Sequence, residues 1–265
     1  MQLRFISWNQ NGFAATGQAA FLARHDWDVC AVQESTTEEA LAAFAAEVGA
    51  GSHVSARALL AEGAEPRYVS ALLARAPWQV AGGATLAVPS PERVVHADAT
   101  RGDISVAVAS LALPPASSPD WGPARKVEQA RGIAAWLRAH AGPVVVGIDG
   151  NTPKVDHPDL AKSVWWNDGE QELLGAERRH GLRDVYRAVL ARDPERARAR
   201  IREAPEGPLA VSYRRGHGDG AVDCRYDSIL ASLHFEVVDA AYDYDGAVRA
   251  GSDHALVAAT LELRG

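Results

Sequence analysis

The fold is decided by the stretch GSDHALVAATLEL, which runs from Gly251 to Leu263. From Ala255 onward this stretch is rich in small, apolar and β-branched residues, which predicts a strand buried against another layer. Asp253 and His254 stand immediately before that strand. Two titratable side chains at the entry of a strand indicate a functional position if other strands of the chain end in the same way.

Four further strand-like segments carry carboxylate or amide side chains at or near one end. These polar residues are Asn9 and Asn11 at the exit of LRFISWN, Glu34 within VCAVQES, Asp149 and Asn151 within VVVGIDGN, and Asp227 within VDCRYDSIL. Ligand sites in sheets commonly lie at the mouths of the strands. The five places together therefore predict that these side chains converge on one end of a sheet.

The rest of the chain alternates between strand-like runs and helical patterns over its 265 residues. Helices are expected at residues 17–25, 36–48, 124–140 and 181–193. The strand-like runs are residues 3–9, 29–35, 67–75, 84–89, 104–113, 144–151, 224–232, 234–240 and 254–263. This pattern predicts an α/β or α+β sandwich of two packed sheets with helices on the outside, in one domain spanning residues 1–265. Residues 154–220 are the least regular part and form a long irregular insertion.

Composition limits the classes of function. The formal net charge of −7 argues against a protein that coats nucleic acid nonspecifically, although it leaves room for a local basic groove. No apolar run approaches the roughly 20 residues of a membrane-spanning helix, and the first residues do not resemble a signal peptide. Cys30 and Cys224 lie in apolar contexts, which predicts buried free thiols. These features are typical of a cytoplasmic protein.

The polar residues at the strand ends favour one chemistry. Carboxylate and amide oxygens are hard ligands that suit Mg²⁺ or Mn²⁺, while amide and imidazole N–H groups donate to phosphate oxygens. Together they match metal-assisted hydrolysis of a phosphoester. Each residue alone has an ordinary explanation: an asparagine forms a turn, Glu34 begins a helix, Asp149 precedes a glycine, and Asp253 with His254 forms a cap. The order and spacing of all five places carry the prediction.

That order resembles the endonuclease/exonuclease/phosphatase superfamily. The matching motifs, in chain order, are WNQNG (8–12), QE (33–34), GIDGN (147–151), RYDSI (225–229) and SDH (252–254), with GLRDVYR (181–187) and VSYRR (211–215) between them. The resemblance covers essentially the whole chain. It implies the deoxyribonuclease I-like fold, an α+β four-layer α/β/β/α sandwich in which two packed mixed sheets are flanked by helices.

The resemblance also implies a role for each polar residue. Glu34 is expected to be the principal ligand of Mg²⁺ (or Mn²⁺), and the other members of the metal shell are expected to be Asn9, Asn11 and Asp253. Asp149 is expected to orient or deprotonate the attacking water, and Asp253 to support His254. Asp227 resembles an acid that supports the metal or a catalytic histidine. The substrate phosphate is expected to be held by Asn9, Asn151 and His254.

The chain departs from the family pattern at one position. Many members carry a second histidine on the strand before the long helix, where this chain has VAVASLALPP and the expected position falls near Ala112. Three interpretations stay open. The leaving group needs no proton, or the chain mainly binds its ligand, or another residue replaces the histidine. The candidates for replacement are His96, His217 and Tyr68.

Within the insertion, the pair Trp165–Trp166 predicts core packing, stacking on bases or the lining of a hydrophobic pocket, and the core is the commoner place for such a pair. The arginine-rich run RARARIREA is typical of a solvated helix face. The sequence thus predicts a Mg²⁺-dependent phosphodiesterase, endonuclease or exonuclease whose partner is a phosphate-containing substrate, with nucleic acid as one possibility. Two alternatives stay open: a phosphatase of phosphomonoesters, phospholipids or inositol phosphates, and a weakly active binding protein on the same fold.

Overall fold

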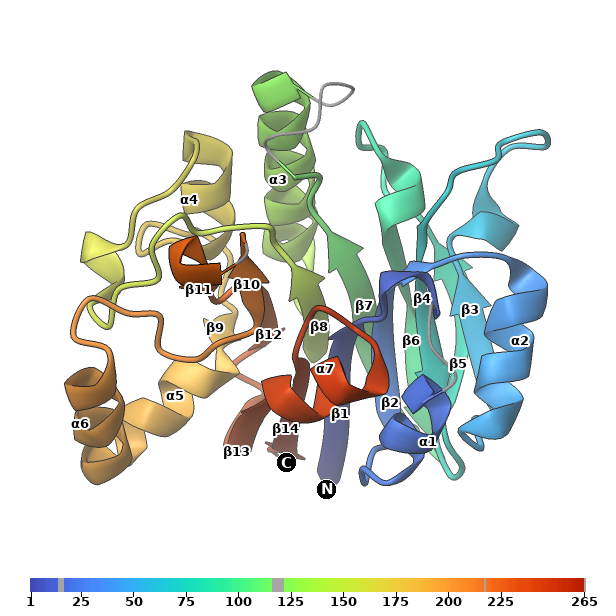
Figure 1. The fold of residues 1–265 in the computed structure, drawn as a ribbon. Helices are drawn as coiled ribbons and strands as arrows, with labels where there is room; N and C mark the ends of the chain where they lie inside the picture. Colours follow the sequence, from blue (N-terminus) through green and yellow to red (C-terminus); the bar gives the residue numbers. More distant parts are fainter. Residues whose placement is uncertain (14–16, 116–121, 217, 265) are drawn as a thin grey trace.

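Two six-stranded β-sheets pack face to face in the computed structural model, which describes residues 1–13, 17–115, 122–216 and 218–264 (Figure 1). The first sheet consists, in spatial order, of β13 (Phe235–Asp243), β14 (Leu256–Leu263), β1 (Gln2–Asn9), β2 (Val29–Ser35), β4 (Val69–Ala74) and β3 (Ser52–Ser55). The second sheet consists of β5 (Gln79–Ala84), β6 (Val94–Arg101), β7 (Ile104–Ala112), β8 (Val144–Asp149), β12 (Asp227–Ala231) and β9 (Arg183–Asp184). Both sheets are mixed, because β1 runs parallel to β2 and β7 runs parallel to β8 while their other pairs are antiparallel.

Helices cover the outer faces of both sheets. The α-helices are α1 (Gly17–Ala23), α2 (Glu38–Glu47), α3 (Gly122–Ala139), α4 (Asp168–Leu174), α5 (Val185–Arg192), α6 (Pro194–Glu203) and α7 (Tyr244–Ala250). The remaining elements are η1 (Asn11–Phe13), η2 (Arg57–Leu59), η3 (Pro91–Arg93), η4 (Leu160–Lys162), η5 (Gly218–Gly220) and the small hairpin of β10 (Tyr213–Arg215) and β11 (Val222–Cys224). Apolar residues of α1, α2 and α7 pack on the first sheet, and those of α3 and α4 pack on the second. The architecture is the predicted α/β/β/α sandwich.

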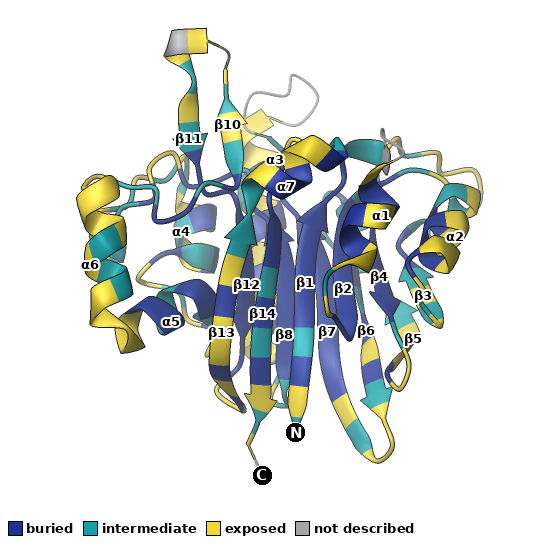
Figure 2. Ribbon diagram, turned by 60° about the horizontal axis from the view of Figure 1, so that its bottom comes forward, coloured by how far each residue is buried: buried dark blue, intermediate teal, exposed yellow. Residues whose placement is uncertain are grey.

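Side-chain alternation explains how the layers form and where the polar groups point. In β1, Leu3 and Phe5 belong to the core between the sheets, whereas Ile6 and Trp8 belong to the core under the outer helices. In β8, Val145 faces the inner core while Val146 and its even-numbered neighbours face α3. Figure 2 shows these central strands as buried along most of their length. Continuing the period of two puts Asn9, at the end of β1, and Asp149, at the end of β8, on the inner faces of opposite sheets.

A close approach between the sheets lies just beneath these strand ends. A Cβ atom on Gly147 would lie 2.8 Å from the Cβ of Ala31, so this position of β8 has no room for a side chain. Beside it, the Gln33 side chain donates to the hydroxyls of Ser7 (3.2 Å) and Ser110 (3.1 Å). The contact fixes the two sheets relative to each other at the level where the polar residues begin.

Most predicted elements are confirmed, with differences that have physical reasons. The four expected helices are present, but residues 84–89 are not a strand: β5 ends at Ala84 and begins earlier, at Gln79. Gly82 and Gly83 obscured that strand because glycine has little strand propensity. The helices α4 and α7, seven residues each, were not predicted because they are too short for a clear period.

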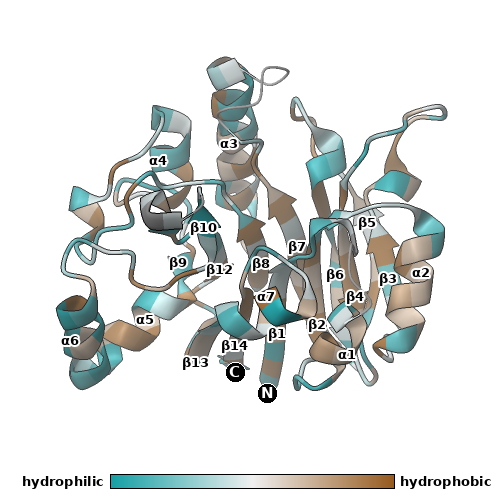
Figure 3. Ribbon diagram, viewed as in Figure 1, coloured by the Kyte–Doolittle hydropathy of each residue, from teal (hydrophilic) through white to brown (hydrophobic). Residues whose placement is uncertain are grey.

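Three other predictions concern the two cysteines, the arginine-rich run and membrane-spanning helices. Cys30 and Cys224 are buried free thiols, as predicted. Helix α6, which contains RARARIREA, buries none of its residues and is hydrophilic (Figure 3), in agreement with a solvated helix face. Among the described residues, no helix combines the length and the apolar character needed to cross a bilayer.

Candidate active site

Strand register brings the predicted polar residues together at one end of the sandwich. Asp149 and Asp227 are direct partners on the antiparallel strands β8 and β12 of the second sheet. Asn9 ends β1 of the first sheet, and His254 lies just before β14, which is antiparallel to β1. Residues that are up to 245 positions apart in the sequence, Asn9 and His254 (254 − 9), therefore lie at the same open end.

Short contacts connect these side chains across the two sheets. The Asn9 side-chain amide donates to Asp149 Oδ2 at 2.9 Å, and His254 Nδ1 lies 2.8 Å from Asp227 Oδ2. Asp149, Asp227 and His254 each offer one ligand atom within 4.8 Å of the others, and all three residues are buried. They form a group that could hold a metal ion. We call Asn9, Glu34, Asp149, Asp227 and His254 the polar cluster.

Glu34 joins this cluster from the end of β2. Its side chain is half-buried and interacts electrostatically with Asp149 and His254. The pairing of β2 with β4 shifts register between Val32 and Ser35, so Glu34 lies at an irregular point of the strand. Its φ of 58° is in the left-handed region, which is uncommon for a residue with a side chain.

Backbone conformation independently marks the same end of the molecule. Among the described residues, the non-glycine residues with positive φ are Asn11 (48°), Glu34 (58°) and Asn151 (46°), and all three are predicted site residues. The Asn11 N–H donates to Asn9 Oδ1 at 2.9 Å, and the Asn151 N–H donates to Asp149 Oδ1 at 3.1 Å. Backbone strain of this kind concentrates at functional sites because the surrounding structure must hold it.

One expectation about this site is corrected. The residue that supports the His254 ring is Asp227, which approaches Nδ1 from the neighbouring sheet, and not the adjacent Asp253. Asp253 is exposed, whereas Asp227 is fully buried.

The cluster has strongly shifted proton affinities. Burial by itself lowers the pKa of His254, but the charges of Asp227 and Asp149 outweigh it and raise the pKa to about 10. Burial raises the pKa of Asp227 to about 6, although the charge of His254 opposes that shift. Burial, followed by the charge of Asp149, also raises the pKa of Glu34. At neutral pH, His254 is therefore an imidazolium facing carboxylates that repel one another.

The donor set fits a hard divalent cation. The cluster contains the carboxylates of Glu34, Asp149 and Asp227 against a single imidazolium, so its negative charge is only partly compensated within it. Its remaining ligand groups are the oxygens of asparagine side chains. Carboxylate and amide oxygens are the ligands of Mg²⁺, Mn²⁺ and Ca²⁺. Burial, with a smaller contribution from the charge of Asp149, raises the pKa of both Glu34 and Asp227, and a bound cation would favour their charged forms.

An aromatic pocket of about 480 Å³ lies beside the cluster, and its lining includes Asn151, which donates to Asp149 of the cluster. The other lining residues are Pro115, Pro123, Trp166, Asn167, Tyr213, Arg215 and Tyr226. The Tyr213 ring stacks on Tyr226 (5.4 Å between centroids) and leans on the His254 ring (4.8 Å). Trp166 is 39% exposed, so the core interpretation of the Trp165–Trp166 pair is wrong for this residue. Arg215 and Lys154 each lie over its ring.

The position of the absent second histidine is occupied by a methyl group. Ala112 is buried and pairs with Asp149 in the parallel register of β7 and β8. Of the replacement candidates, His96 packs against Trp136 of α3 on the outer layer, and the Tyr68 ring lies beside Gly12, near Asn11. His217 lies outside the described residues. Of the two candidates that the structure describes, Tyr68 therefore lies nearer to the predicted site residues than His96 does.

Several residues that hold the site were not assigned a role from the sequence. The Ser212 hydroxyl accepts from the N–H groups of Tyr226 (2.7 Å) and Asp227 (3.0 Å). The Ser252 hydroxyl donates to the Asn9 carbonyl (2.6 Å) and accepts from the His254 N–H (3.0 Å). Ser212 lies in the matched segment VSYRR and Ser252 in SDH, and these motif matches are the feature of the sequence that could have identified the two serines. Tyr213 lies in the first of these segments as well.

Comparison with known proteins agrees with this geometry at the level of fold. No family model matches the sequence, and no curated protein matches it. Among solved structures, the chain is similar to D. rerio TDP2 complexed with a single-strand DNA product (14% identity, TM-score 0.68, covering 98% of this chain and 99% of that one). It is also similar to the endonuclease/exonuclease/phosphatase from Bacteroides vulgatus (14%, 0.69, 100% of both) and to an AP endonuclease from Archaeoglobus fulgidus (17%, 0.66, 97% and 98%). The chain therefore has the fold of the endonuclease/exonuclease/phosphatase proteins, as the resemblance implied.

Proposed function

We propose that this protein is a Mg²⁺- or Mn²⁺-dependent phosphodiesterase. The observation that carries the proposal is the gathering of Asp149, Asp227 and His254 at one end of two sheets, with ligand atoms within 4.8 Å of one another. Glu34 lies close enough to interact electrostatically with Asp149 and His254, so carboxylates outnumber the imidazolium there. In this proposal Glu34 and Asn9 hold the divalent ion, and Asn11 and Asp253 lie further out. When bound, such an ion polarises a phosphoryl oxygen and neutralises charge that develops in the transition state.

The protein's own groups would carry the other steps. Asp149 is held by three N–H groups, from Asn9, from the Asn151 backbone and from the Asn151 side chain, which aims its carboxylate for accepting a proton from water. His254 stays protonated at neutral pH and donates from Nε2 to a phosphate oxygen, while Asp227 keeps its Nδ1 side fixed. The weaker bond of the Asn151 side chain, 3.3 Å to Asp149, is the one that a phosphate oxygen would replace.

A diester fits this site better than a monoester because the aromatic pocket adjoins Asn151. A second esterified group that is flat and apolar, such as a nucleobase, would stack on Trp166 or Tyr213. The Arg215 guanidinium, which lies over the Trp166 ring, would bind a further phosphate of the substrate. The likeness to D. rerio TDP2, described as complexed with a single-strand DNA product, supports a nucleic acid substrate. The absence of a histidine near Ala112 fits a leaving group that needs no proton from that position.

Hydrolysis assays test the proposal. The protein should hydrolyse bis-p-nitrophenyl phosphate and a labelled single-stranded oligonucleotide with Mg²⁺ or Mn²⁺, and chelation should remove the activity. Glu34→Gln and His254→Gln should each lower kcat/KM by about 10³-fold. Turnover of p-nitrophenyl phosphate but of neither diester would favour a phosphomonoesterase. Activity equal to that of the two variants on every substrate would contradict the proposed function.

A further inference from the structure

A buried ion pair lies behind the aromatic pocket and outside the polar cluster. Lys126 of α3 and Glu170 of α4 approach to 2.7 Å (Nζ to Oε1), and both side chains are completely buried. Helices α3 and α4 pack closely there, since a Cβ atom on Gly169 would lie 2.8 Å from the Val127 carbonyl oxygen. The two charges are therefore held at a contact between helices that cannot easily open.

The pair holds both loops that form the edge of the site. On one side, Lys126 Nζ donates to the Asn151 carbonyl (3.0 Å) and the Thr152 hydroxyl donates to Glu170 Oε2 (2.5 Å). On the other side, Glu170 accepts from the Trp166 N–H (2.9 Å) and from the Asn167 side chain (3.0 Å). The residue that would contact phosphate and the ring that forms the pocket wall are thus attached to the same two side chains.

Stability alone does not account for this pair. Removing a lysine and a glutamate from water is costly, and apolar side chains of similar volume at such a place are often equally stabilising or better. Burial lowers the pKa of Lys126, although the charge of Glu170 opposes the shift, so the pair carries this penalty even when intact. What an apolar pair could not supply is hydrogen bonding to four groups in two separate loops.

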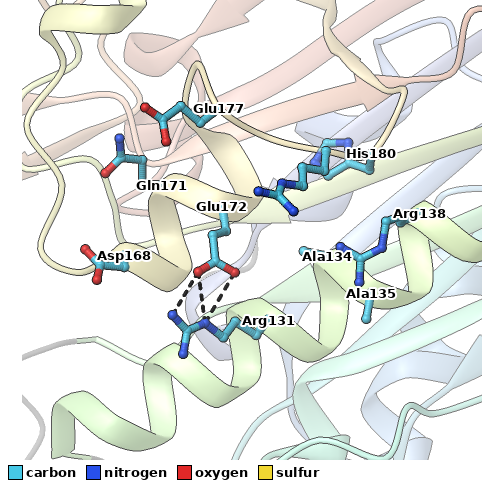
Figure 4. Close-up of a pocket in the computed structure, with 10 residues that line it drawn as sticks. Arg131, Ala134, Ala135, Arg138, Asp168, Gln171, Glu172, Glu177 and His180 are labelled. Atoms are coloured by element: carbon cyan, nitrogen blue, oxygen red, sulfur yellow. Dashed lines mark hydrogen bonds and ion pairs between the residues drawn. The ribbon is translucent and has the colours of Figure 1, made fainter.

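The same two helices carry a second ion pair that serves as a comparison. Arg131 of α3 binds Glu172 of α4 at 2.8 Å, with both side chains about half exposed. Figure 4 shows this pair in an open, highly charged cavity of about 680 Å³ between the helices. The residues that line that cavity do not include any residue of the polar cluster or of the aromatic pocket.

We propose that Lys126 and Glu170 are positioning residues that set Asn151 and Trp166 relative to each other, so that the scissile phosphate and the flat group attached to it bind at the same time. This inference rests on the proposed phosphodiesterase function. It predicts that the pair governs substrate turnover more strongly than it governs folding. A merely structural pair would show the opposite order.

The decisive variant replaces both charges with apolar chains of similar length, Lys126→Met with Glu170→Met. We expect its melting temperature to fall by no more than about 10 °C, because no lone charge remains buried although four loop groups lose their hydrogen-bond partners. We expect kcat/KM for bis-p-nitrophenyl phosphate to fall roughly 10- to 100-fold, since a shift of about 1 Å in a binding group has effects of this size. Hydrogen exchange of the amides of residues 150–152 and 165–167 should accelerate at least about tenfold.

The matched control is Arg131→Met with Glu172→Met, which removes the exposed pair on the same helices. It should leave turnover and loop exchange within about twofold of wild type. If the buried double variant does not fold, Thr152→Val provides the test, because it deletes one loop contact without leaving a charge unpaired. It should lower kcat/KM roughly 3- to 10-fold and accelerate exchange at residues 150–152.

The outcomes separate the two proposals. Wild-type turnover and wild-type loop exchange in the folded double variant, or in Thr152→Val where the double variant is unfolded, would overturn the positioning role. Faster loop exchange with reduced turnover, and no change in the control, would support it. If wild type has no phosphodiesterase activity, the proposed function fails, and a positioning role in that reaction fails with it. Exchange that accelerates in the double variant would then still show that the pair orders both loops.

Discussion

The polar cluster and the aromatic pocket meet at Asn151 but are built in opposite ways. The cluster comes from the ends of strands in both sheets, and Asn9, Asp149 and Asp227 are almost fully buried. Half of the residues that line the pocket come from the irregular part of the chain, where Trp166 precedes α4 and Tyr213 lies in a three-residue strand. Rigid strand ends thus hold the groups that need fixed geometry, and loops supply the surface that would contact the rest of a substrate.

The two regions also differ in what fixes them. The cluster is fixed by sheet register and by short hydrogen bonds between its own members. In the pocket, Tyr213 and Arg215 are fixed by the pairing of β10 with β11, which form a separate two-stranded sheet, and the Trp166 wall is attached to the core through Glu170. Changes in the cluster should therefore stop the chemistry, whereas changes in the pocket should alter how substrate binds.

The largest effect is expected from Asp149→Asn. The amide keeps the shape of the carboxylate but cannot accept a proton from water, so kcat should fall at least about 10³-fold with little change in melting temperature. Asp239→Asn, which alters an exposed acid on β13, is the matched control and should stay within about twofold. Equal activity of the two variants would show that Asp149 contributes no more to the reaction than an exposed acid elsewhere on the sheets.

A loss of about 10²-fold is expected from Asp227→Asn, because it removes the charge that holds the His254 imidazolium. The pKa of His254, followed by NMR, should drop from about 10 toward its ordinary value near 6.5. Activity of the variant should then decline as the pH rises through that lower value. Asp253→Asn should change both quantities less. A larger effect at Asp253 would show that the neighbour in sequence, and not the partner across the sheet, supports the ring.

The cluster should also make the stability of the metal-free protein depend on pH. The pKa of folded His254, about 10, lies above that of an unfolded histidine, near 6.5. Its stabilising contribution is thus complete below pH ~6.5 and is lost as the pH rises through 10. Urea unfolding after chelation should show a decrease of about 2 kcal/mol or more between these values. His254→Gln should lack this component, and an identical pH dependence in the variant would refute the assignment.

In the pocket, Trp166→Ala should raise KM about tenfold for an oligonucleotide or an aromatic diester, since stacking of one ring contributes roughly 1–3 kcal/mol. The kcat value should change less than about threefold, because the cluster is untouched. Val164→Ala, at an exposed neighbouring residue, is the control. A fall in kcat with KM unchanged would mean that Trp166 contributes to the chemical step and not to substrate binding.

The smallest effect is expected on α6. Arg198 and Arg202 are exposed on a helix that buries no residue, so replacing both with alanine should change turnover of single-stranded DNA less than about twofold at 0.15 M salt. Assays at two salt concentrations measure this directly. A severalfold loss with DNA, but not with bis-p-nitrophenyl phosphate, would extend the substrate surface to this helix.

Much of the cluster could be predicted from the sequence because strands have a simple period. Apolar runs that stop at a carboxylate or an amide marked the ends of β1, β2 and β8, and alternation within each run put Asn9 and Asp149 on the inner faces. The order of the motifs then identified the fold. These signals are local, so they can be read from the sequence without knowing which strands pair.

The remainder depended on contacts between distant segments. Nothing local distinguishes Asp227 from Asp253 as the partner of His254, since the choice follows from the packing of one sheet on the other. Lys126 and Glu170 resemble ordinary helix-surface charges in the sequence, and they become buried only because α4, a helix too short to predict, packs on α3. The exposed Trp166 depends on that same packing.

The central claim is that side chains from both sheets form one site for a divalent cation. A crystal soaked with Mn²⁺ and inorganic phosphate, measured at the manganese absorption edge, tests it most directly. We predict one strong anomalous peak within about 2.0–2.3 Å of a Glu34 carboxylate oxygen, with phosphate between it and His254. A peak bound elsewhere, or none at Glu34 at saturating Mn²⁺, would contradict the account.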